Sequence, residues 1–281
     1  MGTVDIVTKE YMRENAIFAD AFNYLIYGGK KVIDPAGLTE VDTATSAVGK
    51  KDALQKYRDV LKAAVIKQDE KMSYVLLGVE NQTDVHYAMP VRNAIYALQY
   101  GKQVSDIAAG HRRSQKDYSG KTGGEYLSGF LKEDHIKPVI TLVIHFGAEE
   151  WDGPLSLHEM MSVSDIEILS FVENYRIHLI DPAKLTEEQL NKFSTSMREV
   201  IGYIKYSKNK DKLLEFLRTD AHRSIEMNAA RVIKTITNTP IEVSEEEGEI
   251  EMCKAIEDLI AESEARGRAA VSYTHLTLPT N

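Results

Sequence analysis

The stretch Tyr74-Val75-Leu76-Leu77-Gly78-Val79-Glu80-Asn81-Gln82 decides the fold. Its first six residues form a short apolar run that ends in polar residues, and this pattern predicts a buried β-strand. Side chains alternate between the two faces of a strand, so Glu80 and Gln82 project to the same face. A carboxylate at the end of a buried strand is costly unless a partner balances its charge, and a metal ion is one such partner.

A second candidate strand, residues 57–66, precedes this one and carries Asp59. Asp59 and Glu80 are oxygen donors of the kind that Mg²⁺ or Mn²⁺ prefers, and the backbone carbonyl of Asn81 is a further donor. With a metal held there, Gln82 would orient the water that attacks a phosphodiester. Residue types and spacing alone leave open the alternative that each acid is a solvated edge residue or part of a local ion pair.

The bulk composition excludes several protein classes. The 281 residues are 43% hydrophobic and 27% charged, as in a globular protein. No apolar run reaches the roughly 18–20 residues that span a bilayer, so we expect no membrane partner. The first residues lack a signal pattern, and the single Cys253 excludes an internal disulfide and a cysteine-rich zinc site. These features favour a cytoplasmic protein.

The negative charge is unevenly distributed. The net charge is −9, yet residues 50–121 hold 13 Lys or Arg against 8 Asp or Glu. Residues 245–264 hold nine acids and one Lys. The segment that carries Asp59 and Glu80 is therefore mildly basic and permits contact with the phosphates of DNA.

Hydrophobic periodicity and turn residues predict a mixed α/β chain with a helical C-terminal part. We expect a core over residues 8–181 and a helical region over residues 182–266. Residues 272–281 (SYTHLTLPTN) resemble translated sequencing-adaptor sequence and are set aside. The expected elements are helices over 8–27, 89–100 with an extension to 116, 208–223 and 250–266, and strands over 57–66, 74–81, 138–144 and 175–180.

Three stretches resemble the recombination-promoting nuclease (Rpn) family of the PD-(D/E)XK nuclease superfamily. They are 15–23 (NAIFADAFN), 78–84 (GVENQTD) with 89–92 (MPVR) and Tyr96, and 138–147 (PVITLVIHFG) with 151–154 (WDGP) and Leu157. The resemblance runs from about residue 10 to about residue 266. It implies a restriction-endonuclease-like mixed sheet flanked by helices, and a divalent-metal-dependent DNA endonuclease that promotes recombination or transposition.

The resemblance also assigns roles to individual residues. Asp20 matches the acid of the first helix and would join Asp59 and Glu80 as a ligand of Mg²⁺ or Mn²⁺. Asp59, Glu80 and Gln82 match the catalytic positions. Gln82 replaces the Lys of the wider superfamily and brings no positive charge, and Arg92 is the nearest compensating cation in sequence. Without the resemblance, Asp20 is equally compatible with a solvated acid on a helix.

Basic residues mark candidate DNA contacts. They are Arg92, Lys50, Lys51, Arg112 and Arg113. Each is also compatible with a solvated charged surface. His145 and His158 lack the spacing of a zinc site.

Two alternatives to the nuclease stay open. One is a DNA-binding or interaction protein of a mobile element, with an inactive nuclease core. The other is a metal hydrolase of small phosphoesters, although the chain lacks the convergent His and Asp set of such enzymes. For the nuclease itself, cutting both strands with one site per chain favours a homodimer.

Overall fold

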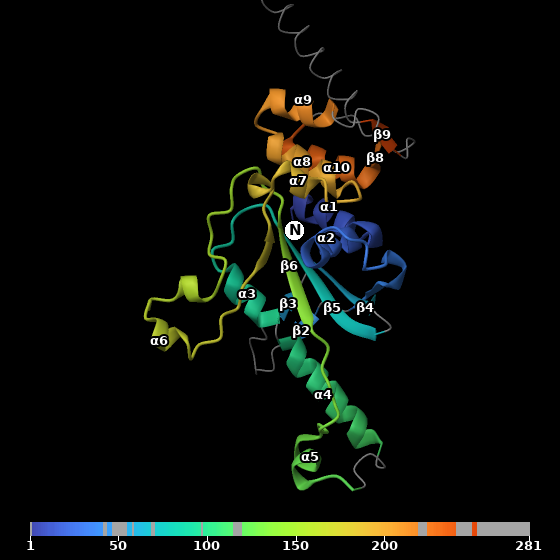
Figure 1. Cartoon of the computed structure of the whole chain (residues 1–281), viewed down its shortest axis with the longest axis vertical. Coiled ribbons are helices and arrows are strands. Elements are labelled where there is room, and N and C mark those ends of the chain that lie inside the picture. The colour runs from blue at the N-terminus through green and yellow to red at the C-terminus, as the bar shows by residue number, and fades with distance from the viewer. Residues whose placement is uncertain are drawn as a thin grey trace, which may run out of the picture. The chain divides into compact units, whose positions relative to one another are not determined.

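The computed structural model describes residues 2–41, 44–46, 55–57, 59–68, 71–96, 98–114, 120–218, 224–239 and 249–251 (Figure 1). These residues divide into two compact units, which are described separately. The sheet unit comprises residues 12–145 and 151–181. The helical unit comprises residues 1–11 and 146–150 and the described residues from 182 onward. The chain changes unit between residues 11 and 12, 145 and 146, 150 and 151, and 181 and 182.

The sheet unit contains most of the strands. Its elements are α2 (Asn15–Tyr27), η1 (Pro35–Gly37), β1 (Thr39–Glu40), β2 (Ala44–Ser46), β3 (Gln55–Tyr57), β4 (Val60–Gln68), β5 (Lys71–Gln82), α3 (Met89–Tyr96), α4 (Leu98–Arg113), α5 (Gly123–Ser128), β6 (Val139–His145), η2 (His158–Met160), α6 (Ile166–Leu169) and β7 (His178–Ile180).

A five-stranded mixed sheet in the order β1-β4-β5-β6-β7 forms its centre. β4 and β5 are antiparallel, and β5, β6 and β7 are parallel. Residues 75–80 of β5 and 141–145 of β6 are buried without alternation, as expected for central strands covered on both faces. The expected α/β class is therefore confirmed, with a mixed sheet flanked by helices.

The register of β4 against β5 defines the two faces of the sheet. Val60 pairs with Val79 and Lys62 with Leu77. Directly paired residues project to the same face and successive residues alternate, so Lys62 and Glu80 lie on opposite faces. Helix α2 lies on the Lys62 face, because the Lys62 ammonium is 4.9 Å from the centroid of the Phe18 ring. Helix α3 lies on the Glu80 face, where Tyr96 donates a hydrogen bond to Glu80.

The expected helix over residues 8–27 is in fact two helices, α1 (Thr3–Arg13) and α2, separated by Glu14 in an extended conformation. The buried Lys62 ammonium donates to the Arg13 carbonyl at 2.5 Å and to the Asn15 amide oxygen at 2.6 Å. Lys62 therefore satisfies a carbonyl that ends α1 and ties the junction to the sheet. This long-range contact is not visible in local periodicity.

Other element boundaries also differ from expectation. The strand expected over 57–66 begins at Val60, and the strand expected over 175–180 begins at His178. The helix expected over 89–100, with its extension to 116, is described as α3 (Met89–Tyr96) and α4 (Leu98–Arg113), and residue 97 between them lies outside the described part of the chain. The helix expected over 250–266 is wrong at its start, because residues 249–251 form a strand. Residues 252–266 lie outside the described part of the chain.

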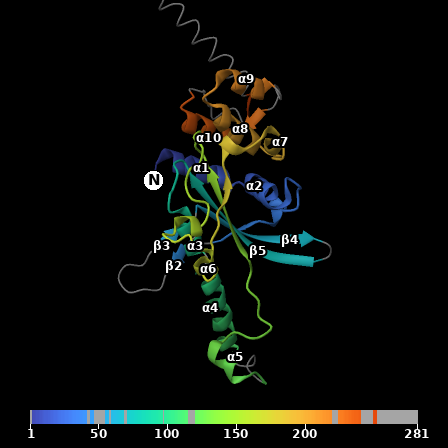
Figure 2. The same cartoon turned by 60° about the vertical axis from the view of Figure 1, so that its left-hand side comes forward.

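An arm of the sheet unit runs from α4 through α5 to β6. Figures 1 and 2 both show α4 extending away from the sheet, with α5 near its far end. Hydrogen bonds tie the outgoing and returning chains at two levels. Gln103 exchanges two with the backbone of Lys137, and His111 bonds to the Asp134 carboxylate.

The helical unit is built around α8. Its elements are α1 as far as Tyr11, η3 (Pro182–Lys184), α7 (Glu187–Leu190), α8 (Met197–Tyr206), α9 (Lys210–Arg218), β8 (Ser224–Glu226), α10 (Met227–Thr237) and β9 (Glu249–Glu251). All residues of α8 from Met197 to Ile204 are buried. Across the described ranges, no helix combines the length and apolar character needed to cross a membrane.

The packing of α8 against α9 depends on a residue without a side chain. A Cβ at Gly202 would lie 2.1 Å from Cζ of the buried Phe216 ring. We predict that Gly202→Ala lowers the free energy of unfolding by about 1–3 kcal/mol, because the ring must shift within a packed interior. A urea-denaturation series measures this loss.

Gly124→Ala is the matched control. A Cβ there meets nothing within 4 Å, and α5 gains a better helix former. Equal stability of Gly202→Ala and the starting protein would contradict the close packing of these helices.

Candidate active site

Glu80 lies at the centre of the candidate site. It is completely buried near the end of β5, on the face covered by α3. Its Oε1 accepts a hydrogen bond from the Tyr96 hydroxyl at 2.5 Å, and its Oε2 lies 2.6 Å from Nη2 of Arg92. The Arg92 Nε also donates to the Tyr96 hydroxyl at 3.1 Å. Arg92 and Tyr96 are four residues apart on α3, a spacing that puts both on one side of the helix.

Asp59 lies beside Glu80. It directly precedes β4, and continuing the register one pair beyond Val60 and Val79 puts it opposite Glu80. Its Oδ2 accepts a hydrogen bond from the backbone N–H of Asn81 at 2.8 Å. The strand pairing therefore brings the two predicted carboxylates together at one end of the β4–β5 ladder.

Electrostatics connect both acids with Arg92. Burial lowers the pKa of Arg92, but the negative charges of Glu80 and Asp59 and the hydrogen bond with Tyr96 outweigh this effect and raise it. Burial, together with the charge of Glu80, raises the pKa of Tyr96. Tyr96 thus remains a neutral donor to Glu80, and Arg92 remains charged.

Gln82 follows Glu80 on the same face, and its neighbour on β6 is His145. Nδ1 of the buried His145 lies 3.3 Å from the backbone oxygen of Gln82. The His145 ring also meets Trp151 edge-on, with 5.4 Å between the ring centroids. His145 and Trp151 therefore line the β6 side of the strand end that carries Gln82. The second histidine considered from the sequence, His158, bonds to the Val172 carbonyl away from this set.

Asp20 is on the other side of the sheet. It is buried on α2, the helix that contacts Lys62 on the face opposite Glu80. Asn81 also projects to that face, because it alternates with Glu80. Its side-chain amide atoms are buried and make no hydrogen bond within the described part of the chain. The end of β5 thus presents polar groups on both faces.

The donor set has the chemistry that a hard divalent cation needs. Asp59 and Glu80 offer carboxylate oxygens, Gln82 an amide oxygen and Asn81 a backbone carbonyl, which are the ligand types of Mg²⁺. Glu80, however, is engaged by a guanidinium. Among the described residues, no group of three or more His, Cys, Asp or Glu is arranged to hold a metal ion. The residues therefore fit the metal by type, and Glu80 must exchange or share its contact with Arg92.

The predicted DNA contacts fall in three places. Arg92 lies at the site, with 24% of its side chain exposed. Arg112 and Arg113 are exposed at the far end of α4, in the arm. Lys50 and Lys51 lie outside the described residues.

In the sequence, Tyr96 stood only within the resemblance and had no assigned role, and His145 was named only as a histidine without the spacing of a zinc site. The signal for Tyr96 was present, because Arg92 and Tyr96 have the i, i+4 spacing of helical neighbours. The signal for His145 was weaker, since its position next to Gln82 depends on a strand register that spacing does not define.

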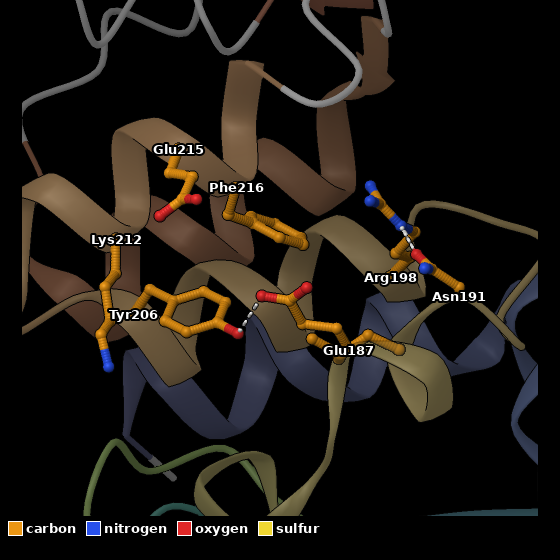
Figure 3. Close-up of a pocket in the computed structure, with 8 residues that line it drawn as sticks. Glu187, Asn191, Arg198, Tyr206, Lys212, Glu215 and Phe216 are labelled. Atoms are coloured by element: carbon orange, nitrogen blue, oxygen red, sulfur yellow. Dashed lines mark hydrogen bonds between the residues drawn. The ribbon is translucent and has the colours of Figure 1, made fainter.

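The helical unit contains an open cavity of about 180 Å³ between α7, α8 and α9, and none of the predicted site residues lines it (Figure 3). Several of its polar side chains are hydrogen-bonded. Arg198 bonds to Asn191 and Glu199 and lies 4.8 Å from the Phe216 ring centroid, and Tyr206 donates to Glu187. Four of the polar side chains that line the cavity, Glu187, Asn191, Arg198 and Tyr206, thus bond within the helical unit.

The chain matches no protein-family model, no curated protein and no solved structure.

The hydrogen bond from Tyr96 to Glu80 should contribute to stability. We predict that Tyr96→Phe lowers the free energy of unfolding by about 1–3 kcal/mol, because a buried carboxylate loses a donor. Tyr175→Phe is the control, since this side chain is 38% exposed. Urea denaturation of both variants measures the difference, and equal stability of the two would contradict a strong bond at Glu80.

Proposed function

We propose that this chain is a divalent-metal-dependent DNA endonuclease of the Rpn type. The observation that carries the proposal is the pairing of Asp59 with the Glu80-Asn81-Gln82 strand end, with Arg92 at the same carboxylate. The order of the elements also agrees with the nuclease core that the sequence resembles. A helix with Asp20 comes first, then the strand after Asp59, the strand with Glu80 and Gln82, and a further helix.

In the proposed reaction, Asp59 and Glu80 would hold Mg²⁺ or Mn²⁺. The resemblance adds Asp20 to these ligands, but Asp20 is carried by α2, which covers the face of the sheet opposite Glu80, so the proposal does not use it. A metal held by Asp59 and Glu80 would supply Lewis-acid polarisation of the phosphodiester and a lowered pKa of bound water. Gln82 accepts a hydrogen bond from the attacking water and orients it. Arg92 offsets the charge that develops on the phosphate, a role for which the planar guanidinium is suited.

In this proposal the arm contacts DNA beside the site, and the length of α4 sets how much of the duplex it covers. Helix α4 has 16 residues, which corresponds to about 24 Å at 1.5 Å per residue. That length spans roughly seven base-pair steps of about 3.4 Å. In this proposal, Arg112 and Arg113 contact backbone phosphates about that far from the scissile bond.

The competing proposal is a DNA-binding protein of a mobile element with an inactive nuclease core. This alternative is favoured by the contacts of Glu80 with Arg92 and Tyr96, because a carboxylate that already has two partners has less capacity to bind a metal ion. Both proposals use the arm to bind DNA, and they differ in whether the site at Asp59 and Glu80 cleaves it.

Cleavage of supercoiled plasmid separates them. With the full chain in Mg²⁺ or Mn²⁺ we expect nicking that EDTA abolishes, and we expect Glu80→Gln to lose at least about 100-fold in rate because one metal ligand is removed. Glu167→Gln, an exposed acid on α6, is the matched control and should retain full activity. Circular dichroism of both variants checks that they fold.

Undiminished cleavage by a folded Glu80→Gln protein would exclude this site. No cleavage with any metal, together with salt-sensitive DNA binding, would favour the inactive-core alternative.

The arm predicts a separate effect on binding. We expect the double variant Arg112→Ala/Arg113→Ala to bind duplex DNA more weakly and to reduce the slope of log affinity against log salt by about 1–2, because each lost phosphate contact removes about 0.9. Fluorescence anisotropy between 50 and 200 mM salt is the measurement. Lys30→Ala, an exposed cation after α2, is the control. An unchanged slope would exclude the arm from the DNA interface.

A further inference from the structure

The ion pair of the site joins a buried anion to a cation whose side chain is partly exposed. Glu80 is 0% exposed, whereas the side chain of its partner Arg92 is 24% exposed. The Arg92 side chain can therefore turn from Glu80 toward solvent, whereas the Glu80 side chain has no access to solvent. Tyr96 contacts both residues and is buried, so it can hold the Glu80 carboxylate in place when Arg92 moves.

The Glu80 carboxylate favours one cation at a time, either the Arg92 guanidinium or a divalent metal ion. A buried carboxylate needs a positive partner because desolvation without one is very costly. A guanidinium and a divalent ion on the same carboxylate repel each other strongly at such short separation, the more so away from bulk water. Arg92 at 2.6 Å from Oε2 therefore opposes a metal ion at that oxygen.

We propose that Arg92 is an exchangeable counter-cation. It neutralises Glu80 in the metal-free protein, and a divalent metal ion replaces it there, so that the guanidinium turns outward to the phosphate of the DNA. The inference rests on the proposed function and adds an order of binding to it. The metal ion binds first, because the phosphate-binding group Arg92 becomes available only at a metal-loaded site. Tyr96 is the positioning residue that keeps Glu80 oriented during the exchange.

The exchange couples metal binding and phosphate binding. The metal releases Arg92 for the phosphate, and a phosphate that holds Arg92 leaves Glu80 to the metal. By linkage, each ligand raises the affinity for the other by the same factor. The guanidinium suits both positions, because its planar fork pairs equally well with carboxylate and phosphate oxygens.

Removal of the counter-cation should strengthen metal binding. We expect Arg92→Met to bind Mn²⁺ about tenfold more tightly than the starting protein in the absence of DNA, a typical size for coupling between two sites. Electron paramagnetic resonance of free Mn²⁺ measures the affinity. The control is Lys30→Met, which removes one exposed positive charge after α2 and should leave the affinity unchanged.

The outcomes separate the two proposals. Mn²⁺ affinity that Arg92→Met leaves unchanged or lowers would overturn the counter-cation while leaving the nuclease intact. No Mn²⁺ binding by either protein, together with no plasmid cleavage, would overturn both.

A measurement on the starting protein covers the case in which Arg92→Met does not fold, since the variant leaves Glu80 without a cation. The ¹⁵N resonance of the Arg92 Nε–H group, assigned by comparison with Arg92→Lys, reports on the contact directly. We expect saturating Mg²⁺ to shift and broaden this signal as the group enters solvent. An unchanged signal while Mg²⁺ raises the melting temperature would overturn the exchange.

Discussion

The complete burial of one carboxylate constrains the structure around it. Glu80 has no contact with water, so its charge must be balanced by neighbours within hydrogen-bond distance. Arg92 and Tyr96 meet this need from one side of α3. The position of α3 on the sheet is thereby linked to the identity of a single residue on β5. An apolar residue at the same place would remove that requirement and, with it, the reason for a polar cluster in the interior.

The β4–β5 hairpin supplies the rest of the arrangement. Its two strands are neighbours in sequence and antiparallel, so the approach of Asp59 to Glu80 needs only a local turn. The parallel pairing of β5 with β6 then brings His145 beside Gln82. The candidate site is therefore assembled in two ways. The acids meet through local pairing, and the groups that surround them come from elements distant in sequence.

The sequence predicted the elements that depend on short local patterns of residues. The apolar run before Glu80 and the alternation between Glu80 and Gln82 define a strand end, and the structure has the strand there. The break at Glu14 was missed because it depends on Lys62, which is far away in sequence and carries no local helix-ending signal. Helix α8 was not assigned from the sequence, although Met197, Val200, Ile201 and Ile204 recur at helical spacing and are buried in the structure. Asp20 was placed on the first helix, but the face of the sheet that this helix covers depends on register and packing.

The arm, unlike the candidate site, can vary independently of the rest of the sheet unit. It leaves after α3 and returns to β6, which pairs directly with β5, so the whole excursion starts and ends at neighbouring parts of one sheet. The free-energy cost of closing such an excursion grows only with the logarithm of its length. Its length can therefore change without altering the register of β5 against β6 or the position of α3. Selection can lengthen, shorten or replace this appendage over generations while the buried carboxylate and its partners stay as they are.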